Sequence, residues 1–260
     1  MNFSGKIKTL QWNIGGGRTC SELSDPADPD SYIEDGLDSI IAILRRENPD
    51  VITLQETHES AGSSQAEIIA GALGLESWFN DSYDDSFMEA GCRIGQAVIS
   101  RYPITNRIFV PFKNPGFRVR DEAGNEIRSI NSGLSAATIE LPDGVSIRIE
   151  TFHMPAFHFF GVDLRSEAAG RVLQEVSGTI GQPGMPTIVQ ADFNLDFPSL
   201  KAALPDFFDG PLREIVQESP TNPKGKRLDH ILYAGLKLET NKVIKDVRTD
   251  HYPLIAQFSW

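Results

Sequence analysis

Polar residues that can perform acid–base or metal chemistry stand at the ends of many apolar segments of this chain. The set comprises Asn13, Glu56, His153, Asp192, Asn194, Asp229, His230, Asp250 and His251. One carboxylate at a strand end is ordinary, but repetition at successive strands gathers several acids at one sheet edge, where their repulsion calls for a cation. Carboxylate and amide oxygens are hard ligands, so the pattern favours magnesium or manganese over zinc.

The five histidines, His58, His153, His158, His230 and His251, lie in or near these segment ends. Histidine in such places indicates proton transfer or contact with phosphate. A single histidine is more often an ordinary surface or core residue, and we keep that interpretation for His58 and His158. We predict a chemical role for His153 and His251, and His230 stays open between the two interpretations.

The apolar periodicity predicts the elements that carry these residues. Alternating or continuous apolar runs predict strands at residues 7–12, 51–54, 95–100, 104–110, 134–141, 145–152, 187–190, 228–233, 236–243 and 254–258. Helical spacing predicts helices over residues 33–44 and 164–180. Asp143-Gly144 predicts a hairpin. Helices between some strands and hairpins between others indicate an α/β (α+β) fold with two packed mixed sheets flanked by helices. We expect one domain, residues 1–260.

The charge balance limits the classes of partner. Thirty-six acidic residues stand against 24 basic ones, for a formal net charge of -12. This is the opposite of the basic surface of a general nucleic-acid binder. A nuclease remains compatible with it, because a bound cation and a local basic loop can draw phosphate to an acidic protein.

The cysteine count and the apolar runs indicate the compartment. Cys20 and Cys92 are the two cysteines of the chain. By themselves they form neither a disulfide framework nor a zinc ligand set, so a reducing cytoplasm is expected. No run approaches the roughly 18 apolar residues of a transmembrane helix, and the start lacks a secretory signal pattern. We therefore expect a soluble cytoplasmic protein, and a monomer.

Seven short motifs in a fixed order resemble the endonuclease/exonuclease/phosphatase (DNase I-like) superfamily. They are QWN at residues 11–13, LQE at 54–56, AVISRYPI at 97–104, TFH at 151–153, ADFN at 191–194, LDHI at 228–231 and TDHYPL at 249–254. Each motif alone is weak, and their order along nearly the whole chain makes the signal specific. The resemblance implies a four-layer α/β sandwich with the site at one end of two packed sheets.

The resemblance also implies a metal site. Glu56 would be the principal ligand of Mg (or Mn), with Asn13 and Asp250 beside it. Gly15 stands where some abasic-site endonucleases have a further acidic ligand. This difference favours a site for one metal ion.

The catalytic roles follow from the same resemblance. His153 would donate to a nonbridging phosphate oxygen, and Asp192 would hold or deprotonate the attacking water. Asn194 would fix that water or stabilise the transition state. Asp229 would orient His251, which as imidazolium would stabilise phosphate charge and otherwise could act as base. Whether Asp192 or His251 takes the proton stays open. No covalent intermediate is needed, since water attacks phosphorus in line.

The expected function is therefore a divalent-metal-dependent phosphodiesterase, acting on nucleic acid or on a nucleotide. Lys226 and Arg227, just before Asp229, are possible substrate contacts, with a solvated loop as the alternative. A sphingomyelinase-like phospholipid enzyme is one alternative, for which the aromatic segment 157–160 is the possible lipid contact, although packing of these rings is preferred. A phosphomonoesterase and an inactive binding module of the same fold are the others.

Overall fold

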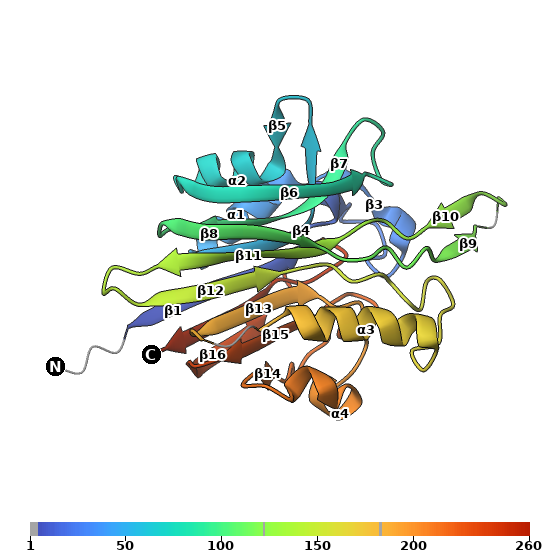
Figure 1. Cartoon of the computed structure of the whole chain (residues 1–260). Helices are drawn as coiled ribbons and strands as arrows, with labels where there is room; N and C mark the ends of the chain where they lie inside the picture. Colours follow the sequence, from blue (N-terminus) through green and yellow to red (C-terminus); the bar gives the residue numbers. More distant parts are fainter. Residues whose placement is uncertain (1–4, 122, 182–183) are drawn as a thin grey trace.

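Two β-sheets with both parallel and antiparallel neighbours form the centre of the computed structural model, which describes residues 5–121, 123–181 and 184–260 (Figure 1). The first sheet has the order β16-β17-β1-β4-β7-β6, with β5 paired to β4. Its strands are β1 (Lys6–Asn13), β4 (Val51–Ser60), β5 (Ser63–Ser64), β6 (Ser77–Asp85), β7 (Arg93–Ser100), β16 (Lys237–Val243) and β17 (Leu254–Ser259). Strands β1 and β4 are parallel, whereas β4 and β7 are antiparallel.

The second sheet has the order β14-β15-β13-β12-β11-β8. Its strands are β8 (Ile104–Pro111), β11 (Gly133–Glu140), β12 (Ser146–Thr151), β13 (Thr187–Asp192), β14 (Arg213–Ile215) and β15 (Asp229–Ala234). Two small sheets lie apart from it: β2 (Arg18–Cys20) with β3 (Tyr32–Asp35), and β9 (Arg118–Arg120) with β10 (Glu126–Arg128). The predicted hairpin is confirmed, because β11 and β12 are antiparallel around Gly144, whose φ is 82°.

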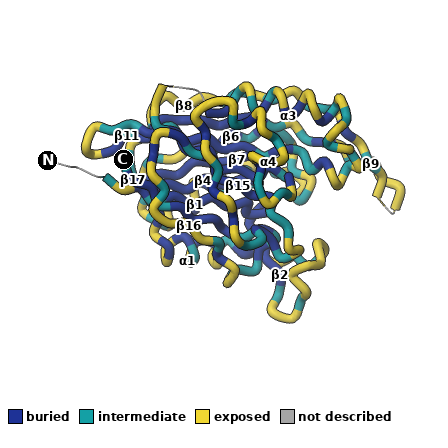
Figure 2. Tube along the Cα trace, turned by 90° about the horizontal axis from the view of Figure 1, so that it is seen from below, coloured by how far each residue is buried: buried dark blue, intermediate teal, exposed yellow. Residues whose placement is uncertain are grey.

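Helices cover the outer faces of both sheets, which confirms the predicted four layers (Figure 1). Helices α1 (Leu37–Glu47) and α2 (Gln65–Leu73) pack against the first sheet, and α3 (Glu167–Thr179) and the short α4 (Leu200–Ala203) against the second. The strand traces in the middle are buried, while helices and connecting loops carry most of the exposed trace (Figure 2). Three 3₁₀ turns, η1 (Gly15–Gly17), η2 (Pro29–Ser31) and η3 (Pro205–Phe208), connect these elements.

The first predicted helix starts later than its spacing indicated. Ile33 lies in β3 and is 76% exposed, and α1 begins at Leu37. The buried face of α1 includes Ile40, Ile41 and Leu44, so the predicted helix over residues 33–44 is right from Leu37 onward and wrong for residues 33–36. Similarly, α3 begins at Glu167, because the Ser166 side chain accepts a hydrogen bond from the Ala169 N–H and caps the helix.

The space between the sheets changes from apolar to polar along the strands. Alternate residues of β1 face the second sheet: Ile7 packs in the apolar core there, and Gln11 donates to Asp229 on β15. On β13, Ile188 belongs to the same core, and Gln190 donates to Thr9. The polar end of this interior is where β1 and β13 terminate, which places the predicted site residues at one end of the two sheets.

In the described part of the chain, no helix has the length and apolar character needed to cross a membrane.

Candidate active site

A β-bulge directs Glu56 into the site. The pairing of β4 with β7 shifts register between Gln55 and Thr57, and Glu56 has a left-handed φ of 53°. A bulge of this kind re-aims a side chain, and a non-glycine residue with positive φ persists only where its surroundings over-determine it. The Glu56 carboxylate accepts a hydrogen bond from Asn13 Nδ2 at 3.0 Å and lies 3.7 Å from His153 Nε2.

Asp192, the last residue of β13, is the point where the site groups meet. Its Oδ1 accepts the backbone N–H of Asn194 at 2.8 Å, and its Oδ2 accepts Asn13 Nδ2 at 3.0 Å. The same Oδ2 lies 3.6 Å from His153 Nε2 and 3.7 Å from His251 Nε2. The side chain of Asp192 is 1% exposed. Four predicted residues from four segments therefore converge on one carboxylate.

Asn194 positions His153. Its backbone turns at a left-handed φ of 51°, and its amide Nδ2 lies 2.9 Å from His153 Nε2 while donating to the carbonyl of Met154 at 2.9 Å. His153 also forms a parallel β-bridge with Asp192. The imidazole is thus fixed from its backbone and from its ring, with its side chain 10% exposed.

His251 and Asp229 form a buried pair across the site. His251 Nδ1 lies 2.8 Å from Asp229 Oδ2, and the other Asp229 oxygen accepts Gln11 Nε2 at 2.9 Å. Burial opposes a charge on His251, but the carboxylates of Asp229 and Asp192 outweigh this effect and hold its pKa well above the ordinary value. The Asp229 bond leaves Nε2 of His251 directed towards Asp192.

The negative charge around Glu56 fits a bound cation. Burial raises the pKa of Glu56, the charge of Asp250 adds to this effect, and His153 opposes it. Asp250 lies against the glycine loop, since a Cβ added at Gly15 would meet its Oδ1 at 3.0 Å. These carboxylates are the hard oxygen donors that a magnesium-type ion prefers. The arrangement is therefore suited to a divalent cation on Glu56 and Asp250.

Asn13, the third predicted metal ligand, has a different contact in this arrangement. Its amide nitrogen faces Glu56 and Asp192, and its oxygen accepts the backbone N–H of Gly15 at 3.0 Å. The side chain thus holds two carboxylates together. Its oxygen keeps a second lone pair, which is the one that could bind a cation.

Ligand-type atoms of Asp192, Asp229 and His251 also lie within 4.8 Å of one another. One carboxylate oxygen of Asp229 already accepts Gln11 Nε2, and the other lies against His251 Nδ1. The backbone N–H of Asp229 donates to Thr221 Oγ1 and fixes the strand start. We interpret this group as a hydrogen-bonded charge network beside the candidate cation ligands Glu56 and Asp250.

His230 does not join the site. It follows Asp229 on β15, so its side chain points to the opposite face of the sheet. There Nε2 lies 3.0 Å from the carbonyls of Leu195 and Arg227, and its ring packs edge-on against Phe193. Burial lowers the pKa of His230. It is a core residue, and His58 and His158 also lie outside the set that converges on Asp192.

The two basic residues before Asp229 have different surroundings. Arg227 donates from Nε to the carbonyl of Gln217 and from Nη2 to that of Glu218, so its guanidinium holds a loop. Lys226 has its backbone N–H bound to Asn222 Oδ1 at 2.9 Å. Burial lowers the pKa of His158, and the positive charge of Lys226 lowers it further, whereas the charge of Asp192 raises it. Lys226 is therefore better placed than Arg227 to contact a substrate.

Sequence reasoning missed a buried relay behind the site. Gln11 donates to both Gln55 and Asp229, and Gln55 donates to Thr151 at 2.7 Å. Each of these side chains is fully buried between the sheets. The signal was present as polar residues at inward positions of otherwise apolar strands, next to the motif residues Asn13, Glu56 and His153.

Comparisons with known proteins show which family model and which solved structures this chain resembles. A family model described as "Endonuclease/Exonuclease/phosphatase family" matches residues 10–251. No curated protein matches the chain in sequence.

Three similar solved structures illustrate the likeness. An endonuclease/exonuclease/phosphatase from Beutenbergia cavernae has a TM-score of 0.73 and 18% identity, over 97% of this chain and 71% of that one. The human Nocturnin catalytic domain with bound sulfate has 0.64 and 19%, over 98% and 96%. D. rerio TDP2 complexed with a single-strand DNA product has 0.63 and 14%, over 98% and 99%.

Proposed function

Because the chain belongs to the endonuclease/exonuclease/phosphatase family, whose members are metal-dependent phosphoesterases, we propose that it is a magnesium- or manganese-dependent phosphodiesterase acting on nucleic acid or a nucleotide. In this proposal the whole chain, residues 1–260, acts as one catalytic domain, since both sheets supply site residues. The observation that carries it is the convergence of Asn13, His153 and His251 on the buried Oδ2 of Asp192.

Each side chain has a role that its contacts support. Asp192, held by Asn13 and Asn194, is the carboxylate that orients the attacking water. His153, fixed by Asn194, offers its ring to a nonbridging phosphate oxygen. His251, oriented by Asp229, directs Nε2 towards the same space and stabilises charge as it develops on the phosphate.

A cation held by Glu56 and Asp250 would act as a Lewis acid that polarises the phosphoryl oxygens. We therefore expect hydrolysis to fall to background when EDTA removes divalent ions, and to return with Mg²⁺ or Mn²⁺. Phosphate release or cleavage of a fluorescent substrate measures the loss of hydrolysis and its return. Ca²⁺, which is larger and less strictly octahedral, is the control ion. Full activity in EDTA would contradict the metal role.

The substrate class is tested by a panel measured with Mg²⁺, Mn²⁺ and chelator. It contains plasmid DNA, single-stranded DNA, RNA, abasic-site duplex, sphingomyelin in liposomes, inositol phosphates and a sugar phosphate. Turnover of a nucleic acid is expected. Turnover of the sugar phosphate or inositol phosphates alone would replace the diesterase with a phosphomonoesterase. Inactivity on every substrate would favour a binding module of the same fold.

The aromatic segment gives a lipid substrate little support. Phe157 is 1% exposed and packs on Phe117, and Phe160 packs on the same ring. Phe159 is 49% exposed. The preferred packing interpretation is thus confirmed for two of these three rings, and one exposed ring is a small apolar surface for membrane contact.

Lys226 is expected to act on substrate binding. Its loop is tied to the residue after His251, because Tyr252 N–H donates to the Thr221 carbonyl and Thr221 N–H donates to the Lys226 carbonyl. We predict that Lys226→Ala raises KM for an anionic substrate about three- to tenfold and leaves kcat within about twofold, since a partly buried cation outside the catalytic set contributes to binding more than to chemistry. Steady-state kinetics at low and high salt measure this effect.

The matched control is Lys6→Ala, because Lys6 is exposed at the opposite end of β1 from Asn13. Its KM should not change. Equal changes in KM for the two variants would indicate an effect of net charge and remove Lys226 from the binding surface.

A further inference from the structure

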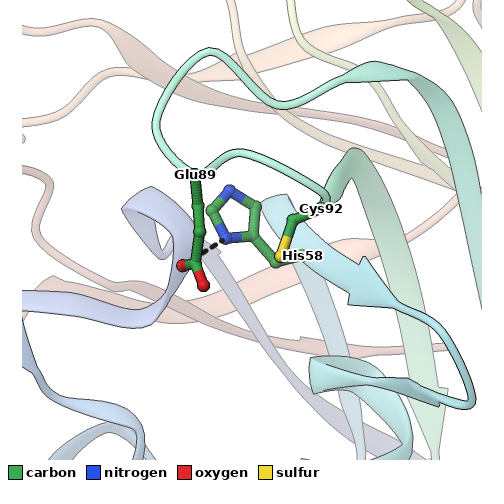
Figure 3. A group of neighbouring side chains, drawn as sticks. All are labelled: His58, Glu89 and Cys92. Carbon is green, nitrogen blue, oxygen red and sulfur yellow. Dashed lines mark ion pairs between the residues drawn. The ribbon is translucent and has the colours of Figure 1, made fainter.

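A second cluster of ligand-type side chains lies behind the glycine loop of the active site. His58, Glu89 and Cys92 have ligand atoms that lie within 4.8 Å of one another, and Figure 3 shows the carboxylate and the sulfur on either side of the imidazole. His58 comes from β4, and the other two come from the loop between β6 and β7. We propose that these three residues form a zinc-binding site, separate from the catalytic cation site.

The donor set selects the type of metal. Imidazole nitrogen and thiolate sulfur are ligands for zinc, whereas magnesium prefers oxygen. The two cysteines alone gave no zinc site in the sequence, since histidine and glutamate must complete it. The cluster therefore differs in hardness from Glu56 and Asp250, and the two sites should select different ions.

The loop from Ser86 to Cys92 is built to bring its two ligands together. The Cys92 N–H donates to the Glu89 carbonyl at 3.2 Å, which closes a turn, and the Ser86 N–H donates to the Cys92 carbonyl at 2.8 Å. Ser86 Oγ also accepts the N–H groups of Met88 and Glu89. The turn therefore brings the Glu89 carboxylate and the Cys92 sulfur next to His58, one on either side of its ring.

His58 is already oriented for coordination. Its Nε2 lies 2.8 Å from Ser86 Oγ, and its Nδ1 lies 3.8 Å from the Glu89 carboxylate. Ser86 Oγ already accepts two backbone N–H groups, so its hydroxyl donates to Nε2 and the ring proton lies on Nδ1. Zinc on Nδ1 therefore requires the other tautomer, with the N–H on Nε2 directed at Ser86 Oγ. Arg18, 3.5 Å from the Glu89 carboxylate, holds it from the other side.

The spacing is slightly wider than in a loaded site. Zinc bonds of about 2.0–2.3 Å place neighbouring ligand atoms roughly 3.5 Å apart. The Glu89 side chain is 52% exposed, so it has room to move closer to His58, whose Nδ1 lies 3.8 Å from its carboxylate.

The fourth position of a tetrahedral ion would face a pocket. The cluster lines an open pocket of about 500 Å³, together with Gly16, Gly17 and Gln65. Among the described residues, no fourth histidine, cysteine or acid belongs to the group. Solvent is therefore the expected fourth ligand.

The site also supports the catalytic end of the sheet. The glycine loop lies directly on the ring of His58, since a Cβ at Gly16 would come within 2.5 Å of its Cε1. The preceding residue, Gly15, faces Asp250. Zinc on His58 would thus stabilise the loop that separates the two metal sites.

Metal titration of the full-length protein tests the proposal, with excess Mg²⁺ to occupy the oxygen site. Competition against a chromophoric chelator should show one tightly bound Zn²⁺, and Co²⁺ in its place should give a thiolate-to-cobalt charge-transfer band. In Cys92→Ser the band should disappear, and zinc affinity should fall at least about tenfold. Glu89→Gln, at a half-exposed position, should weaken zinc by a similar factor.

The matched control is Cys20→Ser, which removes the other cysteine and should keep both the band and the affinity. Saturating zinc should raise the Tm of the wild-type protein by roughly 2–6 °C and leave that of Cys92→Ser unchanged. Absence of the cobalt band in the wild-type protein would overturn the site. Zinc affinity equal in wild type and Cys92→Ser would also overturn it, because the ion would then lie on the catalytic carboxylates.

Discussion

Asp192→Asn is expected to lower turnover by roughly two to four orders of magnitude, the range typical of a lost general base or water-orienting carboxylate. The substitution keeps the size of the side chain and removes its charge. Both oxygens of Asp192 accept hydrogen bonds, Oδ1 from the Asn194 N–H and Oδ2 from Asn13 Nδ2. The new amide therefore meets a donor with its own NH₂ in either orientation, so the site also loses its alignment.

Metal-dependent turnover, metal affinity and Tm, measured together, separate these effects. A mismatch of two buried donors costs about 1–3 kcal/mol, so the variant should still fold. The control is Asp209→Asn, which removes an exposed carboxylate after η3 and should leave turnover unchanged. Turnover in Asp192→Asn within tenfold of wild type would refute the role of this carboxylate.

The strands that were predicted correctly are those with a continuous apolar or alternating pattern, such as β7 and β13. The sequence did not predict β6, whose segment Ser77–Asp85 contains four acidic or amide residues and lies at the sheet edge. Tertiary pairing with β7 makes it a strand in spite of low β-propensity. Ile33 shows the opposite error, because helical spacing alone cannot tell a helix from an exposed strand before it.

The site residues are predictable in type and order more than in geometry. The motifs named Glu56 and Asn194, but the left-handed backbone that aims each one depends on a bulge and a turn that no local pattern announces. His230 illustrates the value of strand parity: it stands beside Asp229, and alternation alone sends it to the opposite face. The amide orientation of Asn13 depends on two carboxylates from distant segments as well as on the nearby N–H of Gly15, so sequence could not predict it.

His251→Ala is expected to lower turnover by roughly two to four orders of magnitude, because the side chain stabilises charge on the reacting phosphate or takes a proton. Single-turnover kinetics measure this loss apart from product release. The control is Lys6→Ala, which removes an exposed side chain at the opposite end of β1 from Asn13, and its kcat should stay within about threefold. Equal losses in the two variants would indicate that His251 has no specific part in the reaction.

The role of Asp229 can be separated from that of His251 by combining substitutions. If Asp229 acts by orienting His251, Asp229→Asn lowers turnover alone but adds little to His251→Ala, because the group that it orients is already gone. For folding stability, Asp229→Asn should partly reverse the loss caused by His251→Ala. His251→Ala leaves a fully buried carboxylate without its 2.8 Å partner, at a cost of about 3–5 kcal/mol, and Asp229→Asn then neutralises that charge. The double variant should therefore have a higher Tm than His251→Ala and nearly the same turnover. Multiplicative losses in turnover would show instead that Asp229 contributes to the reaction by a route that does not pass through His251.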